Sequence, residues 1–106
     1  MRKVILGVAA SLDSLIEGPN GEYDWCFTDQ DYGITEMTNR VDTLFMGRKT
    51  YELMLTIKDA GIEGYSEMKK YVFSTTLQEV KEGEFLIGDN VRKEVERIKN
   101  DEGKDI

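Results

Sequence analysis

The chain has 106 residues, a size typical of one domain, and 40% of them are hydrophobic, so it can bury a core. Its formal net charge of −7 argues against nucleic acid or an anionic membrane as the main partner. It has no histidine and a single cysteine, which excludes histidine chemistry and an internal disulfide. No apolar run approaches the roughly 20 residues that span a bilayer, and the N-terminus does not have the pattern of a signal peptide, so we expect a cytoplasmic protein.

Four short apolar runs predict strands at residues 4–9, 43–46, 71–73 and 85–87. The runs are continuous rather than alternating, which is typical of strands covered on both faces. The first run is followed by the turn signal Gly18-Pro19-Asn20-Gly21.

Helical patterns lie between the predicted strands. One runs from 48 to 57, with Tyr51, Met54 and Leu55 on one face. A second runs from 91 to 98, with Asp89 or Asn90 as its N-cap, and a third starts at Asp29 or Asp31 and ends near Asn39. Strands and helices therefore alternate, which predicts an α/β fold with a mostly parallel sheet.

Polar residues follow three of the predicted strands: Gly47-Arg48-Lys49-Thr50, Ser74-Thr75-Thr76 and Gly88-Asp89-Asn90. In open α/β sheets, ligands bind at the carboxyl ends of the strands, and the N-terminus of a helix there favours an anion. The two cations would add charge, and the hydroxyls of Thr50, Ser74 and Thr75 would add hydrogen bonds. The alternative is that the cations form a solvated helix start, Thr50 a cap and Ser74-Thr75-Thr76 an ordinary turn.

The end of the first predicted strand carries the small residues Ala9 and Ala10, followed by a loop that could cover a ligand. Asp13 is either a turn carboxylate or part of a site. Asp29 and Asp31 either form a solvated edge and a helix cap, or orient or protonate a nitrogen heterocycle in a cleft.

Trp25 and Phe27 are either core residues or one wall of a flat pocket. Nothing in the sequence gives the carboxylate spacing that a divalent metal or a glycosidase site requires, so no metal ligands are predicted.

The order of "VILGVAASLDSLIEGPNGEYDW", "TLFMGRKTYE", "KKYVFSTTL" and "GKDI" resembles the dihydrofolate-reductase-like family. Within that family, the chain is most similar to the reductase domain of bifunctional riboflavin-biosynthesis proteins and to their small stand-alone bacterial homologues. The resemblance covers essentially the whole chain. It implies a three-layer fold and an NADPH-dependent reductase that transfers hydride to a small heterocycle, such as a ribosylaminopyrimidine or a pteridine.

The resemblance also implies roles for the candidate residues. The motif Gly47-Arg48-Lys49-Thr50 would bind the phosphates of NADPH, and Ser74 and Thr75 would lie near the adenosine 2′-phosphate. Ala9 and Ala10 would border the nicotinamide. Asp13, Trp25 and Phe27 would contact the substrate, and Asp29 or Asp31 would be the pocket carboxylate that acts in catalysis.

Two features depart from the family. Ser14 stands where the family usually has glycine, and Leu15 stands where it often has an aromatic residue. Members also continue past "GKDI" with the rest of a central strand and a Gly-Gly turn. We therefore expect residues 1–106 to form one incomplete domain, truncated after its fourth strand and the following helix. Such a domain would be either inactive alone or a non-catalytic assembly module completed by partner chains in an intertwined homo-oligomer.

Overall fold

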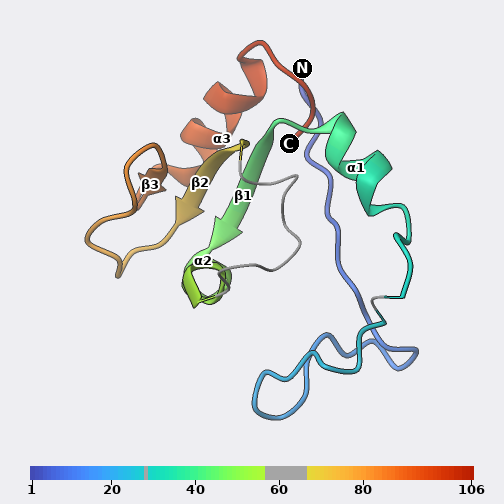
Figure 1. Ribbon diagram of the computed structural model, residues 1–106. Helices are drawn as coiled ribbons and strands as arrows, with labels where there is room; N and C mark the ends of the chain where they lie inside the picture. Colours follow the sequence, from blue (N-terminus) through green and yellow to red (C-terminus); the bar gives the residue numbers. More distant parts are fainter. Residues whose placement is uncertain (28, 57–66) are drawn as a thin grey trace.

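The computed structural model describes residues 1–27, 29–56 and 67–106 of the chain (Figure 1). Its elements are, in chain order, α1 (Ile34–Arg40), β1 (Thr43–Gly47), α2 (Arg48–Thr56), β2 (Lys69–Phe73), β3 (Phe85–Ile87) and α3 (Val91–Asn100). The three strands and the two longer helices confirm the pattern-based predictions within a few residues at each end. Ile57, the last residue of the predicted second helix, lies outside the described residues.

The strands form one parallel sheet in the order β1-β2-β3. Gly47 at the end of β1 lies opposite Phe73, and Phe73 lies opposite Ile87 at the end of β3. Because the strands are parallel and in this register, their carboxyl ends meet at one edge of the sheet. The parallel α/β fold predicted from the alternating elements is thereby confirmed.

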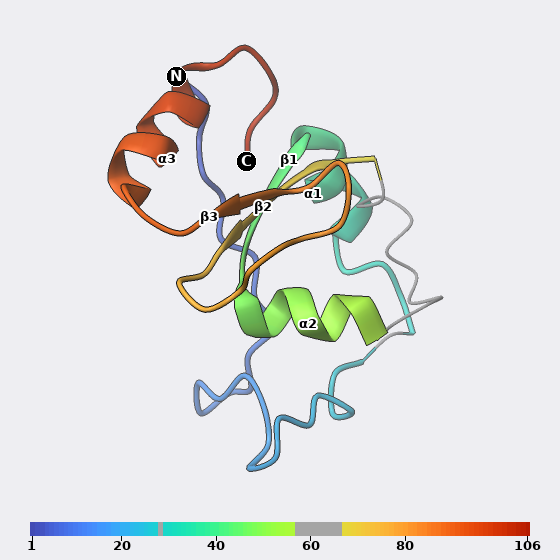
Figure 2. The same ribbon diagram turned by 90° about the vertical axis from the view of Figure 1, so that its left-hand side faces the viewer.

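Helices cover both faces of the sheet, which explains why the strand sequences are apolar without alternation (Figure 2). On one face the core is centred on Tyr51 of α2, with Met46 and Val72 from the strands. On the other face it is centred on Ile98 of α3, with Tyr71, Ile87 and Ile106. The arrangement is therefore three layers, with α2 and α3 on opposite sides of the sheet.

The prediction of a strand at residues 4–9 was wrong, because these residues form no strand in the structure. The segment is extended, and it is hydrogen-bonded to the end of the chain at Ile106. There the Ile106 amide donates to the Lys3 carbonyl and the Ile5 amide donates to the Ile106 carbonyl, both at 2.8 Å. A strand requires a neighbour along its length, and among the described residues none pairs with this segment beyond Ile5. The sheet consequently has three strands rather than four.

The helix predicted to begin at Asp29 or Asp31 begins later, at Ile34. Tyr32 and Gly33 have φ angles of 51° and 79°, which a right-handed helix does not allow. Asn90 precedes α3 as predicted, but it also has a positive φ and makes no side-chain cap hydrogen bond. No helix in the described parts of the chain has the length and apolar character needed to cross a membrane.

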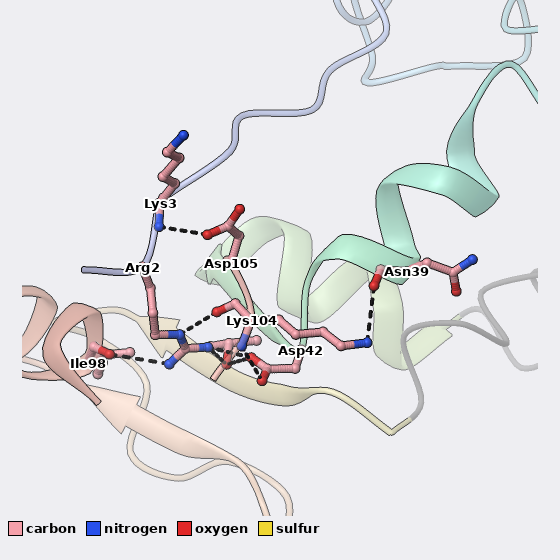
Figure 3. A network of polar contacts seen from close by, with 8 residues as sticks. Arg2, Lys3, Asn39, Asp42, Ile98, Lys104 and Asp105 are labelled. Carbon is pink, nitrogen blue, oxygen red and sulfur yellow. Dashed lines mark hydrogen bonds and ion pairs between the residues drawn. The ribbon is translucent and has the colours of Figure 1, made fainter. Parts of the chain in front are cut away.

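The two ends of the chain are tied together by Arg2, whose side chain is buried (Figure 3). Its guanidinium donates hydrogen bonds to the carbonyls of Lys104 at 2.5 Å and Ile98 at 3.2 Å. It also donates to the hydroxyl of Thr43 at 2.6 Å and pairs with the carboxylate of Asp42. This network fixes the N-terminus and the residues after α3 against the start of β1.

Candidate functional site

The carboxyl ends of the three strands bring the predicted polar segments to one edge of the sheet. Gly47 leads directly into α2, Phe73 is followed by Ser74, and Ile87 is followed by Gly88. The Ser74 amide donates to the Ile87 carbonyl at 3.1 Å, which keeps the last two segments in contact beyond the strands. Gly47 and Ser74 therefore open on the same edge, as the sequence predicted. The N-termini of α2 and α3 follow this edge, so free backbone N–H groups and the positive ends of two helix dipoles meet there.

The junction between β1 and α2 carries the two predicted cations. α2 begins at Arg48 itself, so the motif supplies the first turn of the helix, which contains no acidic residue. Lys49 and Thr50 are exposed. The Arg48 guanidinium donates to both carboxylate oxygens of Glu52, at 3.1 and 3.0 Å. Arg48 is thus already paired one turn along its own helix, which the sequence analysis did not identify although the spacing of four residues signals it.

The segment after β2 forms a compact turn organised by Ser74. The Ser74 hydroxyl accepts hydrogen bonds from the amides of Thr76 and Leu77, both at 3.1 Å. Its oxygen also lies 3.3 Å from the Thr76 hydroxyl. A Cβ atom at Gly88 would lie 3.3 Å from the Ser74 carbonyl oxygen, so glycine suits the close approach of the two segments. Ser74 therefore shapes this edge through its acceptor oxygen and can still donate its hydroxyl proton to a ligand, while Thr75 is exposed.

The residues predicted to contact nicotinamide and substrate lie on the N-terminal segment and the loop after it. Ala9 and Ala10 are exposed on the extended segment that runs in the same direction as β1. Asp13 accepts a hydrogen bond from the Ser11 hydroxyl at 2.5 Å, within its own turn. Trp25 and Phe27 are exposed, at 37% and 81% of their surface. Both figures show this loop extending away from the sheet, so these residues are not gathered with the polar edge.

The two candidate catalytic carboxylates bind neighbours within the turn before α1. Asp29 accepts a hydrogen bond from the Tyr32 hydroxyl at 2.6 Å. Asp31 accepts hydrogen bonds from the Thr35 hydroxyl at 2.5 Å and from the Thr35 amide at 3.2 Å. These bonds lower the pKa of Asp31 below its usual value, with the hydroxyl contributing most. Asp31 is therefore ionised at neutral pH and is suited to orient an N–H group rather than to donate a proton.

A small cavity of about 120 Å³ lies under α2, and the sequence gave no signal for it. Its lining residues are Met46, Tyr51, Met54, Leu55, Lys70, Lys81 and Glu84. The Tyr51 hydroxyl accepts a hydrogen bond from the Lys81 amide at 3.0 Å. Burial raises the pKa of Tyr51, and the Glu84 carboxylate raises it further, so the hydroxyl stays protonated. Ligand pockets typically measure about 300–1,000 Å³, so this cavity is too small for a dinucleotide.

In the parts of the chain that the structure describes, no group of three or more acidic or cysteine side chains is arranged to hold a metal ion. The edge formed by residues 47–50, 74–76 and 88–90, which we call the polar edge, is the strongest candidate site because it brings together the residues predicted to bind phosphates. It combines two helix N-termini, the cations Arg48 and Lys49, the carboxylate of Asp89 and several hydroxyls.

Comparison with known proteins finds longer relatives. The chain is 40% identical to the uncharacterized protein YyaP of Bacillus subtilis, over 99% of this chain and 61% of that protein. It is 28% identical to YwjB of the same organism, over 99% of this chain and 62% of that protein. The chain thus spans about three fifths of the length of the curated relatives it matches. No family model matches the chain.

A solved structure shares the fold. The crystal structure of a "putative riboflavin biosynthesis protein" from Shewanella sp. PV-4 matches 88% of this chain and 58% of its own, with a TM-score of 0.64. The two sequences are 31% identical. The small parallel α/β arrangement described above is therefore also found in that larger protein.

Proposed function

We propose that the polar edge binds the phosphate groups of NADPH, and that the protein is a reductase domain that transfers hydride to a small heterocycle of the riboflavin-pathway or pteridine type. The observation that carries the proposal is the convergence of Gly47-Arg48-Lys49-Thr50 and Ser74-Thr75 on one edge, at the start of a helix. The similarity to a protein described as acting in riboflavin biosynthesis supports the choice of pathway.

The residues present fit a phosphorylated cofactor. The first turn of α2 offers backbone N–H groups that have no partner within the helix, and it contains no acidic side chain, which suits a pyrophosphate. Lys49 is exposed, and the Ser74 hydroxyl can donate to a further phosphate oxygen. NADPH would supply the hydride chemistry itself, while these residues would bind and orient the cofactor.

The first experiment is a binding titration of the chain with NADPH, NADH and a flavin, repeated with Arg48→Ala. Loss of a charge-assisted hydrogen bond should weaken NADPH binding by roughly tenfold or more. If Arg48 contacts the 2′-phosphate, NADH binding should change little, whereas contact with the pyrophosphate should weaken both nucleotides equally.

Arg97→Ala is the matched control, because Arg97 also pairs with a carboxylate on its own helix, Glu94 at 2.9 Å, but on the later turns of α3. It should leave binding unchanged. Equal affinities of the Arg48→Ala variant and the unmodified chain for all three ligands would remove Arg48 from the site. Absence of any nucleotide binding would refute the proposal.

A further inference from the structure

We infer that the Tyr51 hydroxyl is a positioning group for the polar edge: it holds the connection that carries Ser74 in a fixed place relative to the start of α2. The inference rests on the proposed function, because these two segments are the ones that would bind the phosphate groups of NADPH. Tyr51 is a positioning residue rather than a catalytic one, since only 4% of its surface is exposed and it lies in the core under α2.

Residues 74–84 connect β2 to β3 and contain no helix and no strand. Both ends of this connection belong to the polar edge. It begins with the turn organised by Ser74, and the short strand β3 that follows it leads to Gly88. A segment without regular structure of its own is held in place by its contacts with neighbouring elements. The position of the Ser74 turn therefore depends on what holds residues 74–84.

Two kinds of contact hold the connection against α2. Leu77 and Val80 pack on the core cluster that contains Tyr51. The Lys81 amide donates a hydrogen bond to the Tyr51 hydroxyl at 3.0 Å, between residues that are 30 positions apart in the chain. In the described parts of the chain, Tyr51 is the only residue of α2 that hydrogen-bonds to this connection. Apolar packing is not directional, whereas a hydrogen bond fixes both distance and angle.

The small cavity under α2 makes this hydrogen bond important. The cavity has about 120 Å³, and its lining includes Tyr51, Lys81 and Glu84. Glu84 is a second residue of the connection, and its carboxylate also interacts with the Tyr51 hydroxyl. Close-packed groups cannot shift past one another, but an unfilled space leaves room for the connection to move relative to α2. Packing alone therefore does not define the position of the connection, and the hydroxyl does.

A ligand that contacts both segments is sensitive to their relative position. NADPH carries a pyrophosphate and a separate 2′-phosphate, which would contact the start of α2 and the Ser74 turn at the same time. Inorganic pyrophosphate corresponds to one of these groups alone, so it needs only one segment. When a smaller fraction of the molecules has both segments in the binding arrangement, the affinity for the longer ligand falls in proportion.

Titrations of the chain and its Tyr51→Phe variant with NADPH and with inorganic pyrophosphate test the inference. The variant keeps the buried ring and loses only the hydroxyl. Its NADPH affinity should fall roughly two- to tenfold, the range expected for one lost hydrogen bond, while its pyrophosphate affinity should stay the same. Tyr71→Phe is the matched control, because Tyr71 is also buried but lies in the core on the opposite face of the sheet. It should change neither affinity.

Amide hydrogen exchange measures the positioning directly and requires no ligand. In Tyr51→Phe the Lys81 amide should exchange faster, because it has lost its acceptor. The amides of Thr76 and Leu77, which bond to the Ser74 hydroxyl, should follow. The amide of Val72 in the central strand should be unchanged, which also shows that the variant is folded.

The outcomes separate the inference from the proposed function. If the unmodified chain binds neither NADPH nor pyrophosphate, the proposed function fails and the inference fails with it. If the unmodified chain binds NADPH, three results overturn the inference alone. These are equal NADPH affinities of Tyr51→Phe and Tyr71→Phe, equal losses of NADPH and pyrophosphate affinity in Tyr51→Phe, and unchanged exchange at Thr76 and Leu77.

Discussion

At the residue scale, Arg48 faces two competing partners. Its guanidinium is held by both oxygens of Glu52, yet its position at the start of α2 places it beside the proposed phosphate site. Both side chains are partly exposed, at 40% and 48%, so their pair contributes little to stability and can be exchanged for a ligand. Glu52 therefore is expected to reduce the affinity of the polar edge for anions.

Replacement of Glu52 by glutamine should increase NADPH affinity by a few fold, because surface ion pairs are worth about 0.2–1 kcal/mol and Arg48 no longer has to leave one. Glu96→Gln is the control, since Glu96 forms the equivalent pair with Arg92 on α3. Isothermal titration at low and high salt measures both variants. Unchanged or weaker binding in Glu52→Gln would show that the pair does not compete with the nucleotide.

Asp42 is the second residue whose ionisation matters. Burial acts to raise its pKa, but hydrogen bonds from the Lys104 amide and the Thr43 hydroxyl, together with the charge of Arg2, outweigh burial and lower the pKa below its usual value. A carboxylate with a lowered folded-state pKa stabilises the protein above its unfolded-state pKa of about 3.9. That contribution is lost as the pH falls through the folded-state value.

Asp42→Asn should therefore reduce the free energy of unfolding by about 1–3 kcal/mol at neutral pH, because the buried Arg2 guanidinium loses its charged partner. The difference from the unmodified protein should shrink as the pH falls below about 3.9. Urea unfolding at several pH values measures this. Asp24→Asn, at an exposed position in the N-terminal loop, should cost little throughout. A difference that stays constant with pH would contradict the role of the Asp42 charge.

At the element scale, α2 and α3 each cover one face of the sheet and bury its apolar side chains. Each contributes one strongly buried residue, Tyr51 at 4% and Ile98 at 0% exposure, and leaves its outer face to charged pairs. The apolar residues of α3 are not equally buried. Ile98 is enclosed by the core, whereas Val91 is 48% exposed at the start of the helix.

Ile98→Ala should reduce the free energy of unfolding by about 2–5 kcal/mol, since it removes buried methyl groups and leaves a cavity against Tyr71 and Ile87. Val91→Ala, on the same helix but half exposed, should have a much smaller effect. Chemical denaturation followed by circular dichroism compares them directly. Similar losses for both substitutions would mean that α3 does not cover the sheet as described.

At the scale of the whole molecule, the net negative charge opposes the proposed binding of an anionic cofactor. The chain carries a net charge of −7, so its overall field repels an anionic cofactor. The proposed binding at the polar edge would therefore have to come from short-range donors, namely the helix N-termini, the cations of α2 and the hydroxyl groups. Within the described residues, β1 is a terminal strand of the sheet, and Leu6 and Val8 of the N-terminal segment are exposed.

The sequence by itself determined most of the local structure. Apolar runs without alternation predicted buried parallel strands, and periodic stripes predicted α2 and α3, because these signals depend on neighbours in the chain. The same reasoning placed Gly47-Arg48-Lys49-Thr50 and Ser74-Thr75 at the ends of strands, which the structure confirms.

Tertiary structure decided the rest, because pairing between distant segments leaves no local pattern. Residues 4–9 have the composition of a strand, yet they form none, since beyond Ile5 no described residue completes their hydrogen bonds. The burial of Arg2 against Asp42 and Ile98, and the cavity under α2, also depend on residues far apart in the chain. A strand exists only where a second strand lies beside it, and the sequence of one segment cannot say whether that neighbour is present.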